Sequence, residues 1–478
     1  MADGRPSWLN REVPGQDQVL LPLLGEMLKS YRTANSLTQA ELAERLLIDQ
    51  TYVSKIERGA RVIKNVDFLL RVTQLLDISP GQLGLANSQS TETDSPDSPA
   101  TASQRRWREE RRYLNQHRAS LAAEAVALYP RQVRVRDVPL IAGEGWLPQE
   151  PVRLEEIELT WIDGPQRVAV DGTEPEAFAA RPLRVPGRAY DRYTSAIRYL
   201  DPPTLFENRP SYRLTDLNWH NGNGQMSFGL ANYFDKLDIS EAVGHELAAA
   251  RMKNQHVTWA DLPFRTLLSD PFGFRRRAVI PAITTLTLRR RRTHGTATFM
   301  LHWRDPAKVA TASGLYDVIP AGEFQPSSMA PWDLSNDFDL WRNVVRELSE
   351  EVLGTPEHDG SRSAPIEYDG WPLYRDLGRA LQERRVSIYC LGVALDALTL
   401  AATIMTVLVI DDDVFDDLLA DMVTANAEGI TVFGEAGQHG IPFTEPNVNR
   451  LLTSEPMASP GAGCLALAWR YRGLLLSP

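Results

Sequence analysis

Three glutamates of one predicted helix are spaced so that their carboxylates share a face. Glu347, Glu350 and Glu351 lie three and four positions apart within Asp339–Gly354 (DLWRNVVRELSEEVLG), and residues at these spacings are neighbours on an α-helix. Such carboxylates repel one another unless a cation lies among them, and oxygen ligands suit Mg²⁺ or Mn²⁺. The spacing predicts a divalent metal site, with a solvated acidic helix face as the alternative.

A second group of polar residues occupies a short predicted helix near the N-terminus. The residues that would face the edges of DNA bases are Gln50, Thr51, Tyr52, Ser54 and Lys55. A glutamine can form two hydrogen bonds with adenine, a lysine can reach guanine, and a threonine methyl group can contact thymine. We therefore predict that this helix enters the major groove.

Basic and polar residues on either side of this helix are candidates for phosphate contacts. Gln39 begins the preceding predicted helix, where its side chain and the helix N-terminus can both bond a phosphate. Arg58 and Arg61, together with Lys64, follow the predicted recognition helix. These residues are predicted to hold the DNA backbone while the helix between them contacts bases.

The elements that position these residues are predicted by dense helix signals between Gln18 and Leu85. Apolar residues at helical spacing give the first three helices a buried stripe, and Thr38 with Glu41 forms a capping box before the second. Asn65 and Ser79 are placed to begin a fourth and a fifth helix. The connection between the second and third helices is short, which is typical of a helix-turn-helix. We expect an all-α domain of five helices.

The segment SLTQAELAERLLIDQTYVSKIERGAR carries a family resemblance. It is similar to the Cro and lambda-repressor type of helix-turn-helix, the XRE family, over about Leu20–Leu85. The resemblance implies a sequence-specific transcriptional regulator, usually a homodimer, that binds double-stranded DNA at a palindromic operator. It also implies an ion pair between Arg32 and Glu57. The alternative is a small helical bundle that binds protein or nothing, because acidic and basic residues nearly balance here.

Composition restricts the class of the whole chain. With 478 residues, a formal charge of −11 and 24% charged residues, the chain has the balance of a multidomain globular protein. It is not a basic nucleic-acid coat, so DNA binding must come from a local surface. The two cysteines, Cys390 and Cys464, fit a reducing compartment. The first 13 residues have no apolar core, and we therefore expect a cytoplasmic bacterial protein.

One apolar segment, Ser387–Ile410, is long enough to be considered as a membrane span. It contains Asp396 near its middle, and a buried charge is expensive in hydrocarbon. The segment is rich in Val, Ile and Thr, which favours strands. We predict two buried strands joined by a turn, and no membrane association.

Changes in composition along the chain predict the domain organisation. Residues 87–103 contain no large apolar side chain and are rich in Ser, Thr, Asp and Pro, as in a flexible linker. The predicted parts are a helix-turn-helix domain at 18–86, this linker at 87–103, a basic connecting helix at 104–129, an α+β middle region at 130–277 and a last domain at 278–478.

The basic connecting helix is rich in arginine. Its arginines between Gln104 and Arg118 are residues 105, 106, 108, 111, 112 and 118, against Glu109 and Glu110. Three interpretations remain open for this helix: additional phosphate contacts, a dimerising stalk, or a solvated face with charge pairs one turn apart.

The last predicted domain also carries a family resemblance. Arg346-Glu347-Leu348-x-Glu350-Glu351, preceded by Ile319-Pro320-Ala321-Gly322, resembles the Nudix box and the segment that leads into it. The resemblance implies an α/β/α sandwich in which the three glutamates bind Mg²⁺ or Mn²⁺ and a nucleoside diphosphate compound is cleaved. The box is degenerate, because Phe338 stands where it expects a glutamate and the closing glycine, Gly354, comes one residue late.

Three hypotheses follow from these patterns. The first is a transcriptional regulator whose Nudix-like region senses a nucleotide-type ligand or holds the homodimer together. The second is an active Nudix-type hydrolase with an attached DNA-binding module. The third is an assembly protein in which the large region only dimerises or recruits a partner.

Overall fold

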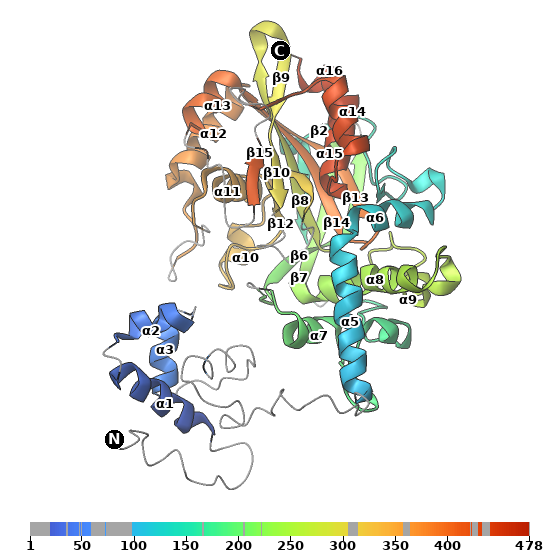
Figure 1. Ribbon diagram of the computed structural model, residues 1–478. Coiled ribbons are helices and arrows are strands. Elements are labelled where there is room, and N and C mark those ends of the chain that lie inside the picture. The colour runs from blue at the N-terminus through green and yellow to red at the C-terminus, as the bar shows by residue number, and fades with distance from the viewer. Residues whose placement is uncertain are drawn as a thin grey trace, which may run out of the picture. The chain divides into compact units, whose positions relative to one another are not determined.

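The structure of the chain is a computed structural model (Figure 1). It describes residues 20–34, 37–46, 48, 50–58, 72, 98–164, 167–203, 206–220, 222–304, 314–356, 364–420, 422, 429–432 and 440–477. The chain divides into two compact units, residues 1–96 and residues 97–478. Among the described residues, no helix combines the length and apolar character that a membrane crossing requires.

The smaller unit contains the first three predicted helices. These are α1 (Leu20–Ala34), α2 (Gln39–Leu46) and α3 (Gln50–Glu57). Their apolar stripes meet in one core, as the spacing predicted, and the core also contains Val72. Its buried members are Leu24, Met27, Leu28, Leu42, Ala43, Leu46, Val53, Ile56 and Val72. The predicted fourth and fifth helices lie outside the described residues, apart from Val72.

The larger unit is α+β. Its helices are α5 (Pro99–Gln116), α6 (Arg118–Ala127), α7 (Tyr193–Leu200), α8 (Tyr233–Lys253), α9 (Pro263–Leu267), α10 (Asp333–Asn336), α11 (Leu340–Leu353), α12 (Pro372–Gln382), α13 (Asp412–Leu418), α14 (Glu445–Ser454), α15 (Ser459–Arg470) and α16 (Arg472–Leu475). Its strands are β1 (Leu140–Ile141), β2 (Val152–Arg153), β3 (Ile157–Trp161), β4 (Leu183–Val185), β5 (Arg188–Ala189), β6 (Pro210–His220), β7 (Asn223–Asn232), β8 (Pro281–Arg291), β9 (Thr296–Phe299), β10 (Leu301–Arg304), β11 (Tyr316–Val318), β12 (Ala321–Glu323), β13 (Val386–Asp396), β14 (Ala402–Asp411), β15 (Gly429–Val432) and β16 (Ile441–Pro442).

The main sheet is mixed and has the order β1-β13-β14-β8-β9-β16, with β12 on β8 and β2 on β13. The antiparallel β13–β14 pair is the predicted double strand of Ser387–Ile410. Asp396 ends β13, and its Oδ1 accepts hydrogen bonds from the Thr399 amide at 2.7 Å and the Thr399 hydroxyl at 2.8 Å. The charge that argued against a membrane span therefore closes the turn between two buried strands.

Helices cover both faces of the main sheet. Figure 1 shows α11, α12 and α13 on one side and α14, α15 and α16 on the other. Alternate residues of β8 contact the two layers: Arg289 pairs with Asp416 of α13 at 2.6 Å, whereas the Thr284 carbonyl accepts from Cys464 of α15 at 3.2 Å. This alternation is what a strand buried on both faces requires.

The predicted boundary between residues 277 and 278 does not separate two cores. Strand β1 pairs with β13, so Leu140 lies opposite Asp396 in the main sheet. A further bridge joins Leu214 of β6 to Val279. Because strands from both sides of the boundary share one sheet and one core, residues 97–478 form a single unit. The Nudix-like sandwich within it remains a prediction.

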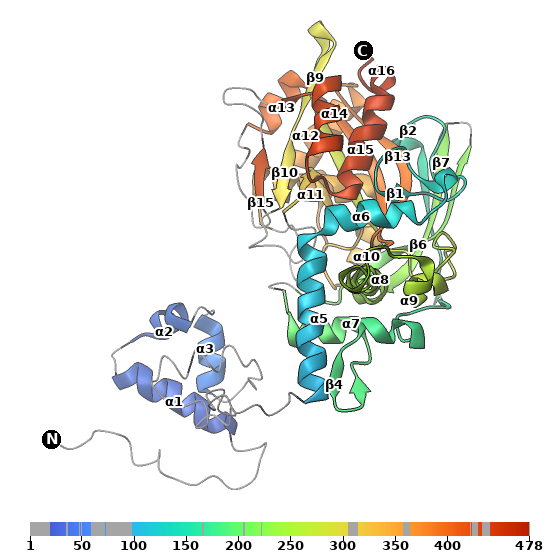
Figure 2. The same ribbon diagram turned by 45° about the vertical axis from the view of Figure 1, so that its right-hand side comes forward.

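The basic connecting helix differs from the prediction in extent and in role. Helix α5 begins at Pro99, within the predicted linker, because the Ser98 hydroxyl accepts from the Thr101 amide at 3.2 Å and caps the helix. Figure 2 shows α5 beside β4 and α7, and Gln104 donates to the Leu183 carbonyl of β4 at 2.8 Å.

Two arginines of the basic segment are interior residues. Arg111 and Arg118 are buried, and each forms an ion pair with Glu241 of α8 at 3.0 Å. These two arginines hold helices together and are not available to phosphate. The phosphate and stalk hypotheses for this helix therefore apply only to its exposed arginines, residues 105, 106, 108 and 112.

Candidate nucleic-acid interface

Two contacts set the angle between the first three helices. The predicted capping box is present: the Thr38 amide donates to Glu41 at 2.7 Å, and the Glu41 amide donates to the Thr38 hydroxyl at 3.2 Å. Gly25 of α1 packs against the backbone of α3, where a Cβ would lie 2.4 Å from the Ile56 carbonyl oxygen. Only glycine permits this approach, so α3 is held against α1 at its C-terminal half.

A charged pair closes the same small unit. Arg32 of α1 donates to Glu57 of α3 through Nε at 2.7 Å and Nη2 at 3.1 Å, as the family resemblance implied. Gln39 of α2 donates to the same carboxylate at 2.8 Å. Burial alone would raise the pKa of Glu57, but these hydrogen bonds lower it. One carboxylate therefore ties all three helices together.

The outward face of α3 is polar and accessible. Val53 and Ile56 are buried, whereas Gln50 and Lys55 are exposed and Tyr52 and Ser54 are half-buried. Thr51 is the second residue of α3. Because α3 spans only two turns, its buried stripe leaves the opposite side of the helix open to a partner.

The predicted phosphate contacts have different environments. Arg58 is exposed just after α3, and its Nε donates to the Ser54 carbonyl at 3.1 Å. Gln39 is half-buried, and its amide nitrogen is already used on Glu57. A phosphate contact by Gln39 would therefore use its backbone amide at the start of α2. Arg61 and Lys64 lie outside the described residues.

Comparison with known proteins assigns this region. The family model for helix-turn-helix domains matches residues 28–83. The N-terminal unit carries a helix-turn-helix domain. Helices α2 and α3 are the two helices that give this motif its name. The Gln39–Glu57 hydrogen bond joins α2 to α3, and the Arg32–Glu57 pair and the close approach at Gly25 join α1 to α3.

Regulators with known names share this helix-turn-helix domain. The chain is 33% identical over 72 residues to the HTH-type transcriptional regulator SinR of Bacillus subtilis and, to the same extent, to SinR of Bacillus licheniformis. The match covers 15% of this chain and 64% of each relative. A solved structure of the restriction-modification controller protein C.AhdI from Aeromonas hydrophila is 36% identical, with 13% of this chain and 94% of that chain covered and a TM-score of 0.12.

The second candidate site predicted from the sequence lies on helix α11 of the larger unit. Asp339 caps α11 by accepting from the Arg342 amide at 2.9 Å, and Gly354 ends it in the left-handed conformation at φ 64°. Leu340, Val344 and Leu348 are buried as predicted. The sequence therefore located this helix to within one residue.

The glutamates of α11 are engaged within the protein. Glu351 is buried and accepts from the Ala321 amide of β12 at 2.9 Å. Glu347 accepts from Asn343 at 3.2 Å and lies so close to Gly322 that a Cβ there would be 2.0 Å from its carboxyl carbon. Across the ranges the structure covers, no group of three His, Cys, Asp or Glu side chains is arranged to hold a metal ion. The Mg²⁺ or Mn²⁺ site at Glu347, Glu350 and Glu351 that the resemblance implied stays a prediction.

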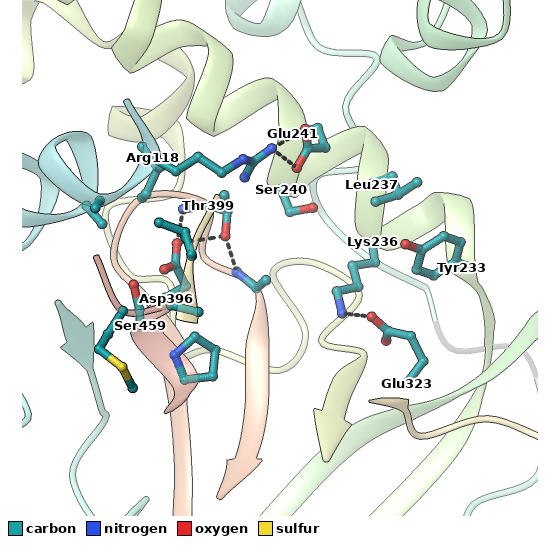
Figure 3. Close-up of a pocket in the computed structure, with 18 residues that line it drawn as sticks. Arg118, Tyr233, Lys236, Leu237, Ser240, Glu241, Glu323, Asp396, Thr399 and Ser459 are labelled. Carbon is teal, nitrogen blue, oxygen red and sulfur yellow. Dashed lines mark hydrogen bonds and ion pairs between the residues drawn. The ribbon is translucent and has the colours of Figure 1, made fainter. Parts of the chain in front are cut away.

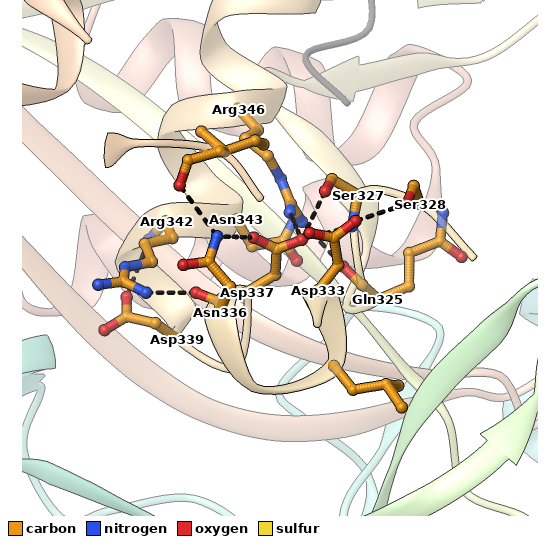
Figure 4. A network of polar contacts seen from close by, with 12 residues as sticks. Gln325, Ser327, Ser328, Asp333, Asn336, Asp337, Asp339, Arg342, Asn343 and Arg346 are labelled. Atoms are coloured by element: carbon orange, nitrogen blue, oxygen red, sulfur yellow. Dashed lines mark hydrogen bonds and ion pairs between the residues drawn. The ribbon is translucent and has the colours of Figure 1, made fainter. Parts of the chain in front are cut away.

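The conspicuous polar feature beside α11 is a buried network around Asp337 (Figure 4). Arg346 pairs with this carboxylate at 3.0 Å, and the amide and hydroxyl of Ser327 donate to it at 2.7 and 2.6 Å. The Tyr368 hydroxyl donates to its other oxygen at 2.7 Å. Burial raises the pKa of Tyr368, so the phenol stays a donor.

Sequence reasoning missed this network, although it contained a signal. The Nudix-box pattern expects its glutamate at position 338, and the neighbouring Asp337 supplies a carboxylate to Arg346 instead. Tyr368 has no signal in the sequence, because it lies 22 residues beyond Arg346 and reaches it only through the fold. The arginine of the motif therefore has a structural role.

Proposed function

We propose that the chain is a sequence-specific DNA-binding transcriptional regulator. The observation that carries the proposal is the helix-turn-helix match over residues 28–83. The exposed face of α3 supports it, because Gln50 and Lys55 are exposed and have the hydrogen-bonding groups that distinguish bases in the major groove.

The proposed complex is a homodimer on a palindromic operator. Helix-turn-helix dimers place their two recognition helices in successive major grooves about 34 Å apart. In the proposed complex, Tyr52 and Ser54 border the bases, Thr51 contacts a thymine methyl group, and Gln39, Arg58 and Arg61 hold phosphates. The larger unit carries the dimer contact, the response to a small molecule, or both.

A selection of genomic fragments with the purified full-length chain tests the proposal. We expect enrichment of a motif with two half-sites separated by about one helical turn, 10–10.5 base pairs. A library in which no fragment is preferred over random duplex would exclude sequence-specific binding. Sedimentation of the bound complex then gives the number of chains on each operator.

Substitutions on α3 test which residues read the bases. Gln50→Ala and Lys55→Ala should each weaken binding to the selected operator by about 1–3 kcal/mol, and they should relax the preference at one base pair. Lys29→Ala removes an equally exposed lysine from α1 and serves as the matched control. If Lys29→Ala weakens binding as much as Lys55→Ala, the two lysines contribute only their charge to DNA binding, and α3 is not the recognition helix.

Diphosphate hydrolysis is not part of the proposal. That activity would need the α11 glutamates to share a metal ion, whereas Glu351 is buried on the Ala321 amide. A nucleotide-type ligand for the larger unit stays a hypothesis, and the chemistry of one cavity of that unit bears on it.

A further inference from the structure

The larger unit contains a half-open cavity of about 170 Å³ with a mixed polar and apolar lining, formed by parts of the chain that are distant in sequence (Figure 3). One wall is a face of α8 that carries Tyr233, Lys236 and Ser240. The other walls are the start of α6, Glu323 of β12, the β13–β14 turn and the start of α15 at Ser459. Because each wall belongs to a different element, a molecule bound here would contact the helices on one face of the sheet and the sheet itself.

Both cations that line the cavity are paired with carboxylates, which leaves the lining with a net negative charge. Arg118 pairs with Glu241 at 3.0 Å, and Lys236 donates to Glu323. Burial alone would raise the pKa of Glu241, but Arg118 and Arg111 lower it to about 2, so it remains ionised. With Asp396, the lining has three carboxylates against two cations. A phosphate ester would meet repulsion here, and these carboxylates are too committed to bind a metal ion.

Hydroxyl groups remain available in the same cavity. Ser240 is 4% exposed and Ser459 is 6% exposed, and neither hydroxyl has a hydrogen-bond partner in the part of the chain that the structure describes. In Figure 3, Ser240 lies between the Arg118–Glu241 pair and the Lys236–Glu323 pair. These two hydroxyls face the open space of the cavity, where a polar occupant would supply the bonds that the described protein does not.

The start of α15 adds one backbone donor to this set. Its N-cap residue is Ala458, which provides no side-chain hydrogen bond to the first turn. Ser459 and Pro460 of that turn line the cavity, and of these two only Ser459 has a backbone N–H. Helix N-termini leave such donors to be satisfied by solvent or ligand.

The remaining surface of the cavity is apolar. Leu237, Leu315, Leu398 and Met457 line it, and the ring of Tyr233 borders it. At about 170 Å³, the cavity is smaller than the roughly 300 Å³ at which drug-sized ligand sites begin. It is therefore too small for a nucleotide. Its hydroxyls, paired charges and apolar side chains suit a small carbon ring that carries hydroxyl groups.

We propose that this cavity binds a small neutral polyhydroxylated molecule of monosaccharide size. The hydroxyls of the ligand bond the Ser240 hydroxyl, the hydroxyl and amide of Ser459 and the outer groups of the two ion pairs, while its C–H face packs against Leu237 and Tyr233. That the ligand regulates DNA binding rests on the proposed function, whereas the binding itself does not.

Thermal unfolding and calorimetry of the full chain test this site directly. The probes are glucose, ribose and myo-inositol, with AMP and ATP as charged comparisons. We expect at least one of the three polyols to raise the Tm by about 2 °C or more at saturation, and neither nucleotide to do so through this cavity.

Substitutions then locate the binding. Ser240→Ala should weaken the binding of that polyol about 5- to 10-fold through loss of one hydrogen bond. Ser240→Leu should abolish it by filling the cavity. Ser335→Ala, a change at an exposed serine of α10, should leave it unchanged. If Ser240→Leu does not fold, the Ser240→Ala titration still decides the outcome.

Three results would overturn the proposal. They are no response to any of the three polyols, a polyol response that Ser240→Ala leaves intact, and a nucleotide response that Ser240→Ala removes. Selection of genomic fragments reports on α3 and not on this cavity. If no polyol binds but the selection yields a clear operator motif, only the proposed cavity site is rejected. If a polyol binds but the selection yields no motif, only the proposed function is rejected.

Discussion

Helices α3 and α11 have the same kind of sequence but opposite use of their polar residues. Both bury an apolar stripe and carry polar side chains on the other side. In α3, Gln50 and Lys55 are left exposed. In α11, Arg346 and Glu351 are buried and bonded within the protein. Polar residues at helical spacing therefore indicate a binding site only where no other element covers them.

The difference follows from the number of elements around each helix. Helix α3 belongs to a small bundle in which α1 and α2 take up its inner face. Helix α11 contacts β12 and β8 on one side and α12 on another, and the Asp337 network fills the space beside it. A helix in a large core bonds most of its polar groups internally, because an unsatisfied buried group costs about 1–3 kcal/mol.

The largest loss of stability is expected from the substitution of Asp337. Asp337→Ala leaves the buried Arg346 guanidinium without its carboxylate and removes the acceptor for Ser327 and Tyr368. We expect a loss of about 3–5 kcal/mol in the unfolding free energy of the larger unit, measured by urea denaturation. Asp369→Ala, at an exposed position, should change it by less than about 0.5 kcal/mol. Equal effects of the two variants would mean that the network does not support α11.

The next largest effect is the dependence of the stability of the larger unit on pH. Glu246 of α8 accepts from the amides of Phe264 at 2.6 Å and Arg265 at 2.9 Å, yet burial raises its pKa from 4.5 to about 7. The folded state keeps this proton while the unfolded chain releases it, so stability should fall as pH rises from 4.5 to 7. The full loss is on the order of 3 kcal/mol.

Variants at two glutamates isolate this titration. Glu246→Gln should flatten the dependence of the urea midpoint on pH across that interval, because the amide does not titrate. Glu109→Gln, at an exposed position on α5, should leave the slope as it is. A slope that persists in Glu246→Gln would assign the proton to another group.

The helix-turn-helix domain should respond to pH in the opposite direction. The lowered pKa of Glu57 means that its stabilisation is present above pH 4.5 and is lost as pH falls below that value. Glu57→Gln should cost about 1–3 kcal/mol of domain stability at neutral pH, measured by chemical denaturation. Adding Arg32→Ala to this variant should cost little more, since the two side chains share one interaction. Additive losses would show that the pair is not coupled.

The smallest effect is expected at the edge of the DNA interface. Arg58→Ala should weaken binding to all sequences alike and reduce the slope of log K against log salt by about 0.9, the value for one phosphate. Loss of preference at one base pair, with the salt slope unchanged, would instead place Arg58 among the base-reading residues.

Local signals in the sequence predicted several features correctly. The capping box at Thr38, the bounds of α11 between Asp339 and Gly354, and the two strands around Asp396 depend on residues a few positions apart. The Arg32–Glu57 pair also followed from a resemblance in one short segment. These features could be predicted because short-range spacing and hydrogen bonding determine them.

Two predictions differ from the structure for different reasons. The start of the basic helix was placed at Gln104, although the local cap at Ser98 and Pro99 begins it inside a segment whose composition is typical of a linker. The division at residue 277 was misplaced because β1 pairs with β13, some 250 residues away, and local spacing carries no signal for such a contact. That the α11 glutamates bind a metal ion stays a prediction.

By itself, the sequence determined that a short helix near the N-terminus presents Gln50 and Lys55 outward, since buried and exposed positions alternate at the helical period. The tertiary structure alone decided which other polar residues remain accessible. Arg118 and Glu351 became interior groups, whereas Ser240 and Ser459 were brought to one cavity without partners. The physical reason is that periodicity sets the direction of a side chain from its own helix, but only the packing of distant elements decides whether another group or open space meets it there.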